Sequence, residues 1–160
     1  MNYRRLAVLV LVAGSLVSCG TTTKTATKTT TSATSANAGA PGDPEKSDRI
    51  LEVHIRSDHR YDPPSIVVSA GETVTFRVTN DDDRASHQFV IGNAKTQNDD
   101  ETVRTDPVTS ADAPNIVDFE PRQSKLTTWT FPSNKGTEII YGSHRGGDYA
   151  AGLKGMFTVG

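Results

Sequence analysis

The sequence contains a single cysteine, Cys19, in 160 residues. A disulfide needs two thiols, so the chain cannot be cross-linked internally and its fold has to be stabilised by a hydrophobic core. Methionine is nearly as scarce, because Met156 is the only one besides the initiator Met1. The chain therefore offers few of the sulfur ligands that soft metal ions prefer.

The chain also lacks an excess of positive charge. It has 17 Lys and Arg against 19 Asp and Glu, and loss of Arg4 and Arg5 with a cleaved N-terminus would leave 15 against 19. A nucleic-acid-binding domain typically carries a basic patch that neutralises phosphates. No basic stripe is present in the sequence, so we expect no nucleic-acid partner.

The apolar stretch at the N-terminus is too short to span a membrane. It comprises residues 6–17 and follows two arginines, whereas a transmembrane helix needs about 20 apolar residues. A basic flank followed by a short apolar stretch is typical of a secretory signal peptide. Residues 16–19 (Leu-Val-Ser-Cys) resemble the bacterial lipobox, although an ordinary secretory signal with a chance cysteine would look similar.

The lipobox resemblance predicts a lipoprotein. We expect residues 1–18 to be removed as the signal peptide and Cys19 to carry the lipid. The lipid would anchor the protein to the outer face of a bacterial membrane in the cell envelope. Residues 19–46 are rich in Thr, Ser and Ala and have no apolar period, which predicts a flexible tether. Residues 47–160 would then form the folded domain.

From residue 47 onward, apolar and polar side chains alternate. Val74, Phe76 and Val78, for example, alternate with polar residues, and this period of two is typical of a half-buried strand. The pattern predicts an all-β, antiparallel sandwich or barrel without helices. The polar stretches 80–85 and 92–115 are predicted to be irregular. The eight predicted strands lie at residues 51–55, 66–68, 74–78, 89–91, 116–119, 125–131, 139–141 and 156–159.

Four parts of the domain resemble the cupredoxins. Residues 61–80 (YDPPSIVVSAGETVTFRVTN) are similar to the opening strands of that family, and residues 87–92 (HQFVIG) to the strand that carries its first copper-ligating histidine. Residues 117–131 resemble the next hairpin, and residues 141–159 resemble the ligand loop and final strand. The resemblance covers residues 51–160 and implies a two-sheet Greek-key β-sandwich.

The resemblance also implies which residues would stand at the copper. A type 1 site needs two imidazoles, a thiolate and a weak thioether. The matching positions here are His87, Ser143, Asp148 and Leu153, so only the first histidine is kept. Serine is not deprotonated near neutral pH, and leucine has no lone pair. We therefore expect no blue-copper electron-transfer centre.

Three side chains are candidates for a metal site of another kind. His87, His144 and Asp148 offer two nitrogens and a carboxylate, which could bind a copper ion as Cu(II), or Zn(II), with water completing the shell. Alternatively, His144 and Asp148 are solvated and His87 is a partly buried histidine without a metal. A third interpretation is that Asp148 accepts a hydrogen bond from His87 or Ser143, so that a polar network replaces copper.

Other polar clusters are assigned to solvated loops. His59 lies among charged residues before a Pro-Pro turn, and residues 81–83 are consecutive aspartates without the spacing of a calcium loop. No base or oxyanion element accompanies Ser143, so the sequence does not favour an enzyme. The prediction is a lipid-anchored cupredoxin-like domain that binds an unidentified protein or metal ion. The alternative is a copper-handling protein that binds Cu(II) through His87, His144 and Asp148.

Overall fold

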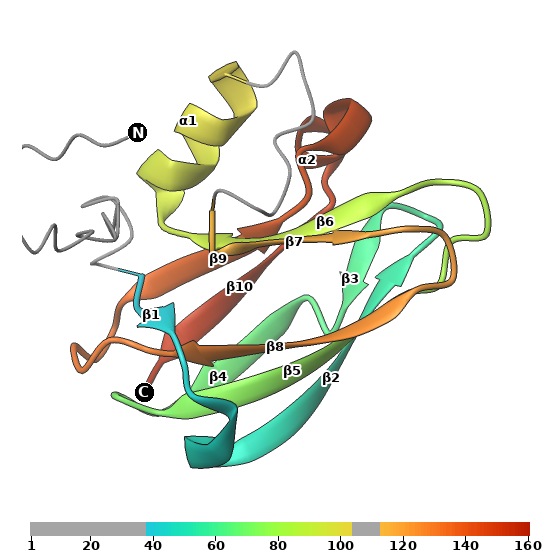
Figure 1. The fold of residues 1–160 in the computed structure, drawn as a ribbon. Helices are drawn as coiled ribbons and strands as arrows, with labels where there is room; N and C mark the ends of the chain where they lie inside the picture. The colour runs from blue at the N-terminus through green and yellow to red at the C-terminus, as the bar shows by residue number, and fades with distance from the viewer. Residues whose placement is uncertain (1–37, 104–112) are drawn as a thin grey trace, which may run out of the picture. The chain divides into compact units, whose positions relative to one another are not determined.

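The computed structural model describes residues 38–103 and 113–160, with only the backbone for residues 99–103 (Figure 1). The predicted signal peptide, Cys19 and residues 19–37 of the predicted tether lie outside the described residues. The same holds for residues 104–112 of the long polar stretch. Among the helices that the structure describes, none has the length and apolarity to cross a membrane.

The domain consists of two five-stranded sheets (Figure 1). The first has the order β1-β8-β5-β2-β3 and the second has the order β4-β10-β9-β6-β7. The two-sheet β-sandwich is thus confirmed, and every predicted strand is present. The strands are β1 (Ala40–Pro41), β2 (Arg49–Arg56), β3 (Arg60–Asp62), β4 (Ser65–Val68), β5 (Thr73–Asn80), β6 (His87–Gly92), β7 (Ile116–Phe119), β8 (Ser124–Thr130), β9 (Glu138–Gly142) and β10 (Lys154–Val159).

The sheets are mixed rather than antiparallel throughout, which corrects the expectation. Strand β2 pairs with β5 in parallel, and β4 pairs with β10 in parallel. Between β2 and β5 the chain passes through β3 and then through β4 in the other sheet. Strand β5 therefore runs in the same direction as β2 and opposite to β3, through which the chain left the first sheet. Alternation along one strand carries no information about the direction of its neighbour.

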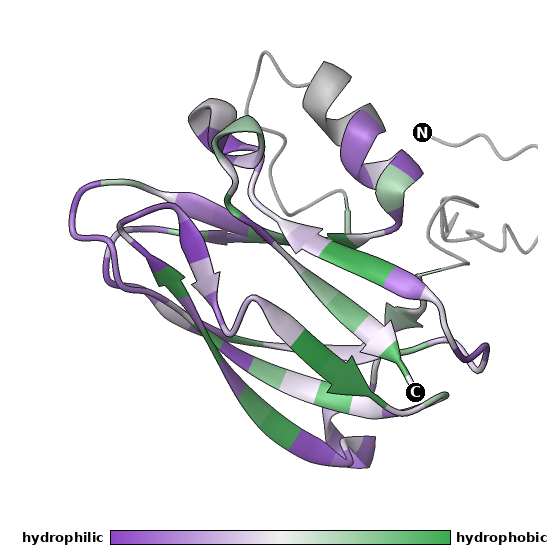
Figure 2. Cartoon of the chain, turned by 180° about the vertical axis from the view of Figure 1, so that it is seen from behind, coloured by the Kyte–Doolittle hydropathy of each residue, from purple (hydrophilic) through white to green (hydrophobic). Residues whose placement is uncertain are grey.

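The core lies between the two sheets. Hydrophobic bands recur along the strands in Figure 2, whereas much of the connecting chain is hydrophilic. Phe76 of β5 and Phe157 of β10 are fully buried, with ring centroids 5.2 Å apart, and Tyr141 of β9 lies 4.5 Å from Phe157. Such tilted aromatic pairs each add about 0.5–1.5 kcal/mol beyond the area that they bury. The aromatic rings thus join the sheets without a disulfide.

The fold begins before residue 47, within the segment predicted to be a tether. Strand β1 pairs with β8, and the short helix η1 (Pro44–Lys46) follows it. The indole Nε1 of the buried Trp129 donates to the carbonyl of Ala38 at 2.8 Å. A buried indole N–H needs such an acceptor. Residues 38–46 are therefore part of the domain.

A helix, α1 (Ala94–Val103), lies in the stretch predicted to be irregular. The sequence carries no signal for it because polar residues surround its whole circumference. The side chain of Asn93 caps its start by accepting from the backbone N–H of Thr96 at 2.9 Å. The amide of Gln97, which is fully buried, donates to the carbonyls of Val90 (3.0 Å) and Ile140 (2.9 Å). Hydrogen bonds to β6 and β9, rather than an apolar face, hold this helix.

Candidate functional site

The candidate residues meet at one end of the sandwich, where β6 begins and the β9–β10 connection turns. This connection, residues 143–153, contains the short helices η2 (Arg145–Gly147) and α2 (Asp148–Ala151), and it begins and ends at the paired Gly142 and Lys154. Gly146 and Gly147 have φ angles of 56° and 85°, a left-handed conformation that glycine adopts without strain. The tight turn places Asp148 against His87 of β6.

A polar network of His87, Ser143 and Asp148 occupies this end of the core. Oδ2 of Asp148 accepts a hydrogen bond from Oγ of Ser143 at 2.6 Å and lies 2.7 Å from Nδ1 of His87. Oγ of Ser143 in turn accepts from the backbone N–H of Gln88 at 3.0 Å. All three side chains are buried, with residue exposures of 1%, 0% and 6%. The hydrogen-bonded arrangement considered as the third interpretation is the one observed.

The protonation of the His87 ring follows from these partners. An ionised carboxylate only accepts, so Nδ1 carries the proton that it donates to Asp148. On the other side of the ring, Nε2 is buried without a hydrogen-bond partner among the described residues, and lies 3.6 Å from Oδ2 of Asp82. Burial lowers the pKa of His87, but the carboxylates of Asp148 and Asp82 outweigh it, and the net shift is upward.

Asp82 contributes to the site although the sequence placed it in a solvated loop. Its Oδ1 accepts from the backbone N–H groups of Arg84 (2.8 Å) and Ala85 (3.0 Å). These two hydrogen bonds, with a smaller contribution from His87, lower the pKa of Asp82. A carboxylate that caps the turn after β5 is thereby fixed with its other oxygen directed towards His87.

His59 also lies at the site, although it stands in an exposed turn, as its assignment to a solvated loop expected. Its Nδ1 is 3.4 Å from Oδ1 of Asp148, and its ring meets the ring of His87 edge to face, with centroids 6.1 Å apart. The side chain remains half exposed. His59 stands in the tight β2–β3 turn with a φ of 57°. Strand β3 has three residues and was not predicted, so no sequence signal located this turn.

His144 has a different environment from the polar network. Its Nε2 forms a 2.7 Å hydrogen bond with Oε1 of Gln97, and its ring stacks on Tyr149 with a centroid distance of 4.6 Å. The residue is buried, with 6% of its surface exposed. The structure therefore brings His87 and Asp148 together and directs His144 towards α1. Among the described side chains, no group of three or more His, Cys, Asp or Glu is arranged to hold a metal ion.

The donor atoms at the family's copper-ligand positions differ from those of a type 1 site. Ser143 presents a hydroxyl that is already donating to Asp148, and Asp148 presents an oxygen that is already accepting twice. Leu153 is fully buried and apolar. A type 1 centre depends on a thiolate and a weak axial thioether. The side chains present do not fit that group.

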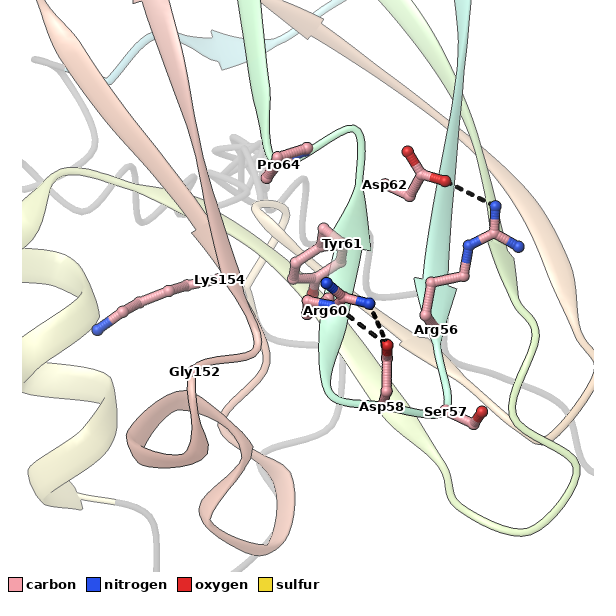
Figure 3. Close-up of a pocket in the computed structure, with 9 residues that line it drawn as sticks. All are labelled: Arg56, Ser57, Asp58, Arg60, Tyr61, Asp62, Pro64, Gly152 and Lys154. Atoms are coloured by element: carbon pink, nitrogen blue, oxygen red, sulfur yellow. Dashed lines mark hydrogen bonds and ion pairs between the residues drawn. The ribbon is translucent and has the colours of Figure 1, made fainter.

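A separate cleft of about 750 Å³ lies beside the β2–β3 turn and the start of β10 (Figure 3). Arg56 pairs there with Asp62 at 2.7 Å, and Arg60 pairs with Asp58. In Figure 3 the side chain of Lys154 points away from both pairs. The two guanidinium groups thus pair with neighbouring carboxylates, and they do not together form a site for an anion in the cleft.

In Figure 1 the helices α1 and α2 both lie on the side of the second sheet that faces away from the first sheet. The sequence predicted α2 only as part of a ligand loop, and it did not predict α1. Gln97 of α1 was consequently absent from the expected site, although its amide contacts both β6 and His144. A glutamine in a polar stretch carries no sequence signal of burial.

Comparison with known proteins finds relatives that are named copper-resistant cuproproteins. The chain is 30% identical to the copper-resistant cuproprotein CopI of Rubrivivax gelatinosus over 122 residues, covering 76% of this chain and 72% of that protein. It is 27% identical to the copper-resistant cuproprotein CopI of Pseudomonas aeruginosa over 151 residues, covering 76% and 81%. No family model matches the chain.

Solved structures similar to this domain include auracyanins. Dithionite-reduced auracyanin from Roseiflexus castenholzii has a TM-score of 0.59 at 25% identity, covering 71% of this chain and 98% of that one. Auracyanin A from Chloroflexus aurantiacus, described as a blue copper protein, has a TM-score of 0.54 at 20% identity and covers 69% and 98%. The chain therefore belongs to the family of the CopI cuproproteins, and its domain has the cupredoxin fold.

Proposed function

We propose that this protein is a lipid-anchored, extracytoplasmic and non-enzymatic cupredoxin-like binding domain that has lost the blue-copper electron-transfer centre. One observation carries the proposal. The carboxylate of Asp148, at a copper-ligand position of the family, accepts from Ser143 and His87, the residues at two other ligand positions. Buried polar groups need partners, and here the former ligand positions satisfy one another. The network keeps the β9–β10 connection closed without a metal.

The non-enzymatic part of the proposal has its own support. In a serine hydrolase, the nucleophilic hydroxyl is hydrogen-bonded to the imidazole that takes its proton. Here Oγ of Ser143 donates to Asp148, and its remaining contact is the N–H of Gln88. This hydroxyl is fully buried, and its proton is directed to a carboxylate instead of an imidazole. The arrangement therefore favours a structural role for Ser143.

Copper titration followed by visible absorption tests the loss of the blue centre. We expect no intense blue band from the purified full-length protein after addition of Cu(II). The matched control is the triple variant Ser143→Cys, Asp148→His and Leu153→Met, which restores the donor set that a type 1 site needs within the same loop. That variant should become blue. An intense blue band in the unchanged protein would overturn the proposal.

The anchor is tested separately. Lipid on Cys19 would hold the protein in the membrane fraction, because each buried methylene contributes about 0.8 kcal/mol. We expect Cys19→Ala to move the protein to the fraction that is not membrane-bound, and mass spectrometry of the unchanged protein to show acyl groups on Cys19. Membrane association that survives Cys19→Ala would contradict the lipid anchor.

A second candidate is a copper-handling protein that binds Cu(II) in a non-blue site through His87, His144 and Asp148. The names of the relatives and the 2.7 Å approach of His87 to Asp148 favour it. It requires His144 to leave Gln97, with which it is hydrogen-bonded. Cu(II) bound in this way would show nitrogen hyperfine coupling by electron paramagnetic resonance. His144→Ala should remove part of that coupling.

A further inference from the structure

The buried nitrogen Nε2 of His87 faces an acceptor instead of a donor. Because Nδ1 carries the proton donated to Asp148, Nε2 has a bare lone pair in the neutral ring. Nε2 has no hydrogen-bond partner among the described residues and lies 3.6 Å from Oδ2 of Asp82. Two acceptors that face each other in a buried site repel each other unless a proton or a metal cation lies between them.

Asp82 is held in this orientation by its own backbone turn. Its Oδ1 is occupied by the N–H groups of Arg84 and Ala85, so Oδ2 is the oxygen that remains towards His87. The side chain of Asp82 keeps 13% of its surface exposed, whereas that of His87 keeps 2%. An ion could therefore reach Nε2 from the side of Asp82, where water can complete its shell.

We propose that a divalent first-row metal ion, Zn(II) or Cu(II), binds between Nε2 of His87 and Oδ2 of Asp82. Two ligands that each lie about 2.0–2.2 Å from a tetrahedral zinc ion are roughly 3.4 Å apart, which is close to the observed 3.6 Å. The site lies at the Nε2 edge of the imidazole, whereas Nδ1 is turned towards Asp148 and the former copper-ligand positions. Water supplies the remaining ligands.

The contact between His87 and Asp148 has a second role in this arrangement. A metal-binding histidine commonly donates its other N–H to a carboxylate, which fixes the tautomer and the ring orientation. Here His87 donates its Nδ1–H to the carboxylate of Asp148 at 2.7 Å. In this one respect the inference rests on the proposed function, because the polar network that closes the former copper site also orients the nitrogen for the new one.

Calorimetric titration of the untagged full-length protein with Zn(II) and Cu(II), each alone, tests the site. Asp82→Asn keeps an Oδ1 that can cap the turn, but removes the charge that binds the metal. We expect Asp82→Asn to abolish measurable binding, and Asp148→Asn to weaken it about 10–100-fold, as is typical when an orienting partner is lost. The matched control is Asp83→Asn, which removes the same charge one position along the chain and should leave binding unchanged.

Nitrogen-15 NMR of the imidazole gives a readout that needs no variant. Addition of Zn(II) should shift the Nε2 resonance of His87 to that of a metal-bound nitrogen while Nδ1 keeps its proton. If Nε2 is instead found to carry a proton in excess Zn(II), the two carboxylates enclose an imidazolium and the inference is overturned. Equal Zn(II) affinity in Asp82→Asn would also overturn it.

The two proposals fail in different ways. A blue band with copper would refute the proposed function, whatever Zn(II) does. Absence of Zn(II) and Cu(II) binding in a protein that shows no blue band would refute the new site and leave the proposed function standing.

Discussion

Asp148 and His87 are 61 residues apart in the sequence, and a 2.7 Å hydrogen bond joins them inside the sandwich. Under the proposed function, this bond takes the place of the metal that joins the same strand and loop in a blue copper protein. The bond also joins two distant parts of the chain, because His87 is the first residue of β6 and Asp148 is the first residue of α2. The stability of the ligand loop should therefore depend on Asp148.

Substitution of Asp148 should destabilise the domain in a graded way. Asp148→Ala leaves Nδ1 of His87 and Oγ of Ser143 without their acceptor, and we expect a loss of about 3–5 kcal/mol in the free energy of unfolding, as for a broken buried pair. Asp148→Asn keeps one acceptor oxygen and should cost about 1–3 kcal/mol. Urea unfolding measures both. Equal stability of Asp148→Asn and the unchanged protein would show that the network contributes little.

Stability should fall at alkaline pH because of two buried tyrosines. Burial raises the pKa of Tyr61, with a smaller contribution from the charge of Asp148, and burial raises the pKa of Tyr141. In the unfolded chain both phenols ionise near pH 10, while in the folded protein they stay protonated. Unfolding then releases protons, so the stabilisation is complete below about pH 10 and is lost as the pH rises towards the folded pKa values.

Tyr141→Phe separates this effect from simple alkaline damage. The variant loses the 2.6 Å hydrogen bond from the phenol to the carbonyl of Pro63, at a cost of about 1 kcal/mol near neutral pH. Its melting temperature should nevertheless fall less steeply above about pH 10, because one raised pKa has been removed. An identical alkaline slope in both proteins would exclude Tyr141 as a source of the effect.

The strands and the network were predictable for different reasons. Strands such as β5 alternate between core and solvent, and this alternation is visible in the sequence, where Val74, Phe76 and Val78 recur at every second position. The contact between His87 and Asp148 could be considered because the resemblance placed both residues at copper-ligand positions. Neither periodicity nor composition would have joined residues that far apart.

The remainder of the site had no local signal. Helix α1 lacks an apolar face, so its packing depends on the hydrogen bonds of Gln97 to other elements. The turn with His59 precedes a strand of three residues, too short to show alternation. Asp82 stands in a run of aspartates whose composition resembles that of a solvated loop. In each case, what brings the residue to the site is its contact with residues distant in the sequence, and a single sequence does not encode such contacts as a pattern.

Gln97 should be the residue that holds α1 to the sandwich. Its side chain contacts the carbonyls of Val90 and Ile140 and the imidazole of His144. Gln97→Leu keeps the approximate size of the side chain but removes these three hydrogen bonds, and we expect a loss of about 1–3 kcal/mol. Hydrogen exchange should accelerate along α1 in this variant and not in β5. Unchanged exchange in α1 would contradict the role given to Gln97.

The last prediction tests whether the domain begins before residue 47. Gly39 has a φ of 100°, and a Cβ at this position would collide with the carbonyl oxygen of Thr130 and lie 2.7 Å from Nε1 of Trp129. The matched control is Gly136, which also has a positive φ of 75°, but a Cβ there would meet nothing within 4 Å. Both substitutions to alanine carry the backbone strain of about 1–2 kcal/mol.

Only Gly39→Ala adds the clash with β8. If residues 38–46 belong to the folded domain, Gly39→Ala should lower the free energy of unfolding by at least about 1 kcal/mol more than Gly136→Ala does. The fluorescence of Trp129, whose indole donates to Ala38, should also change in Gly39→Ala alone. If these residues were instead a flexible tether, the chain could relax around the new methyl group. Gly39→Ala would then be the milder of the two variants.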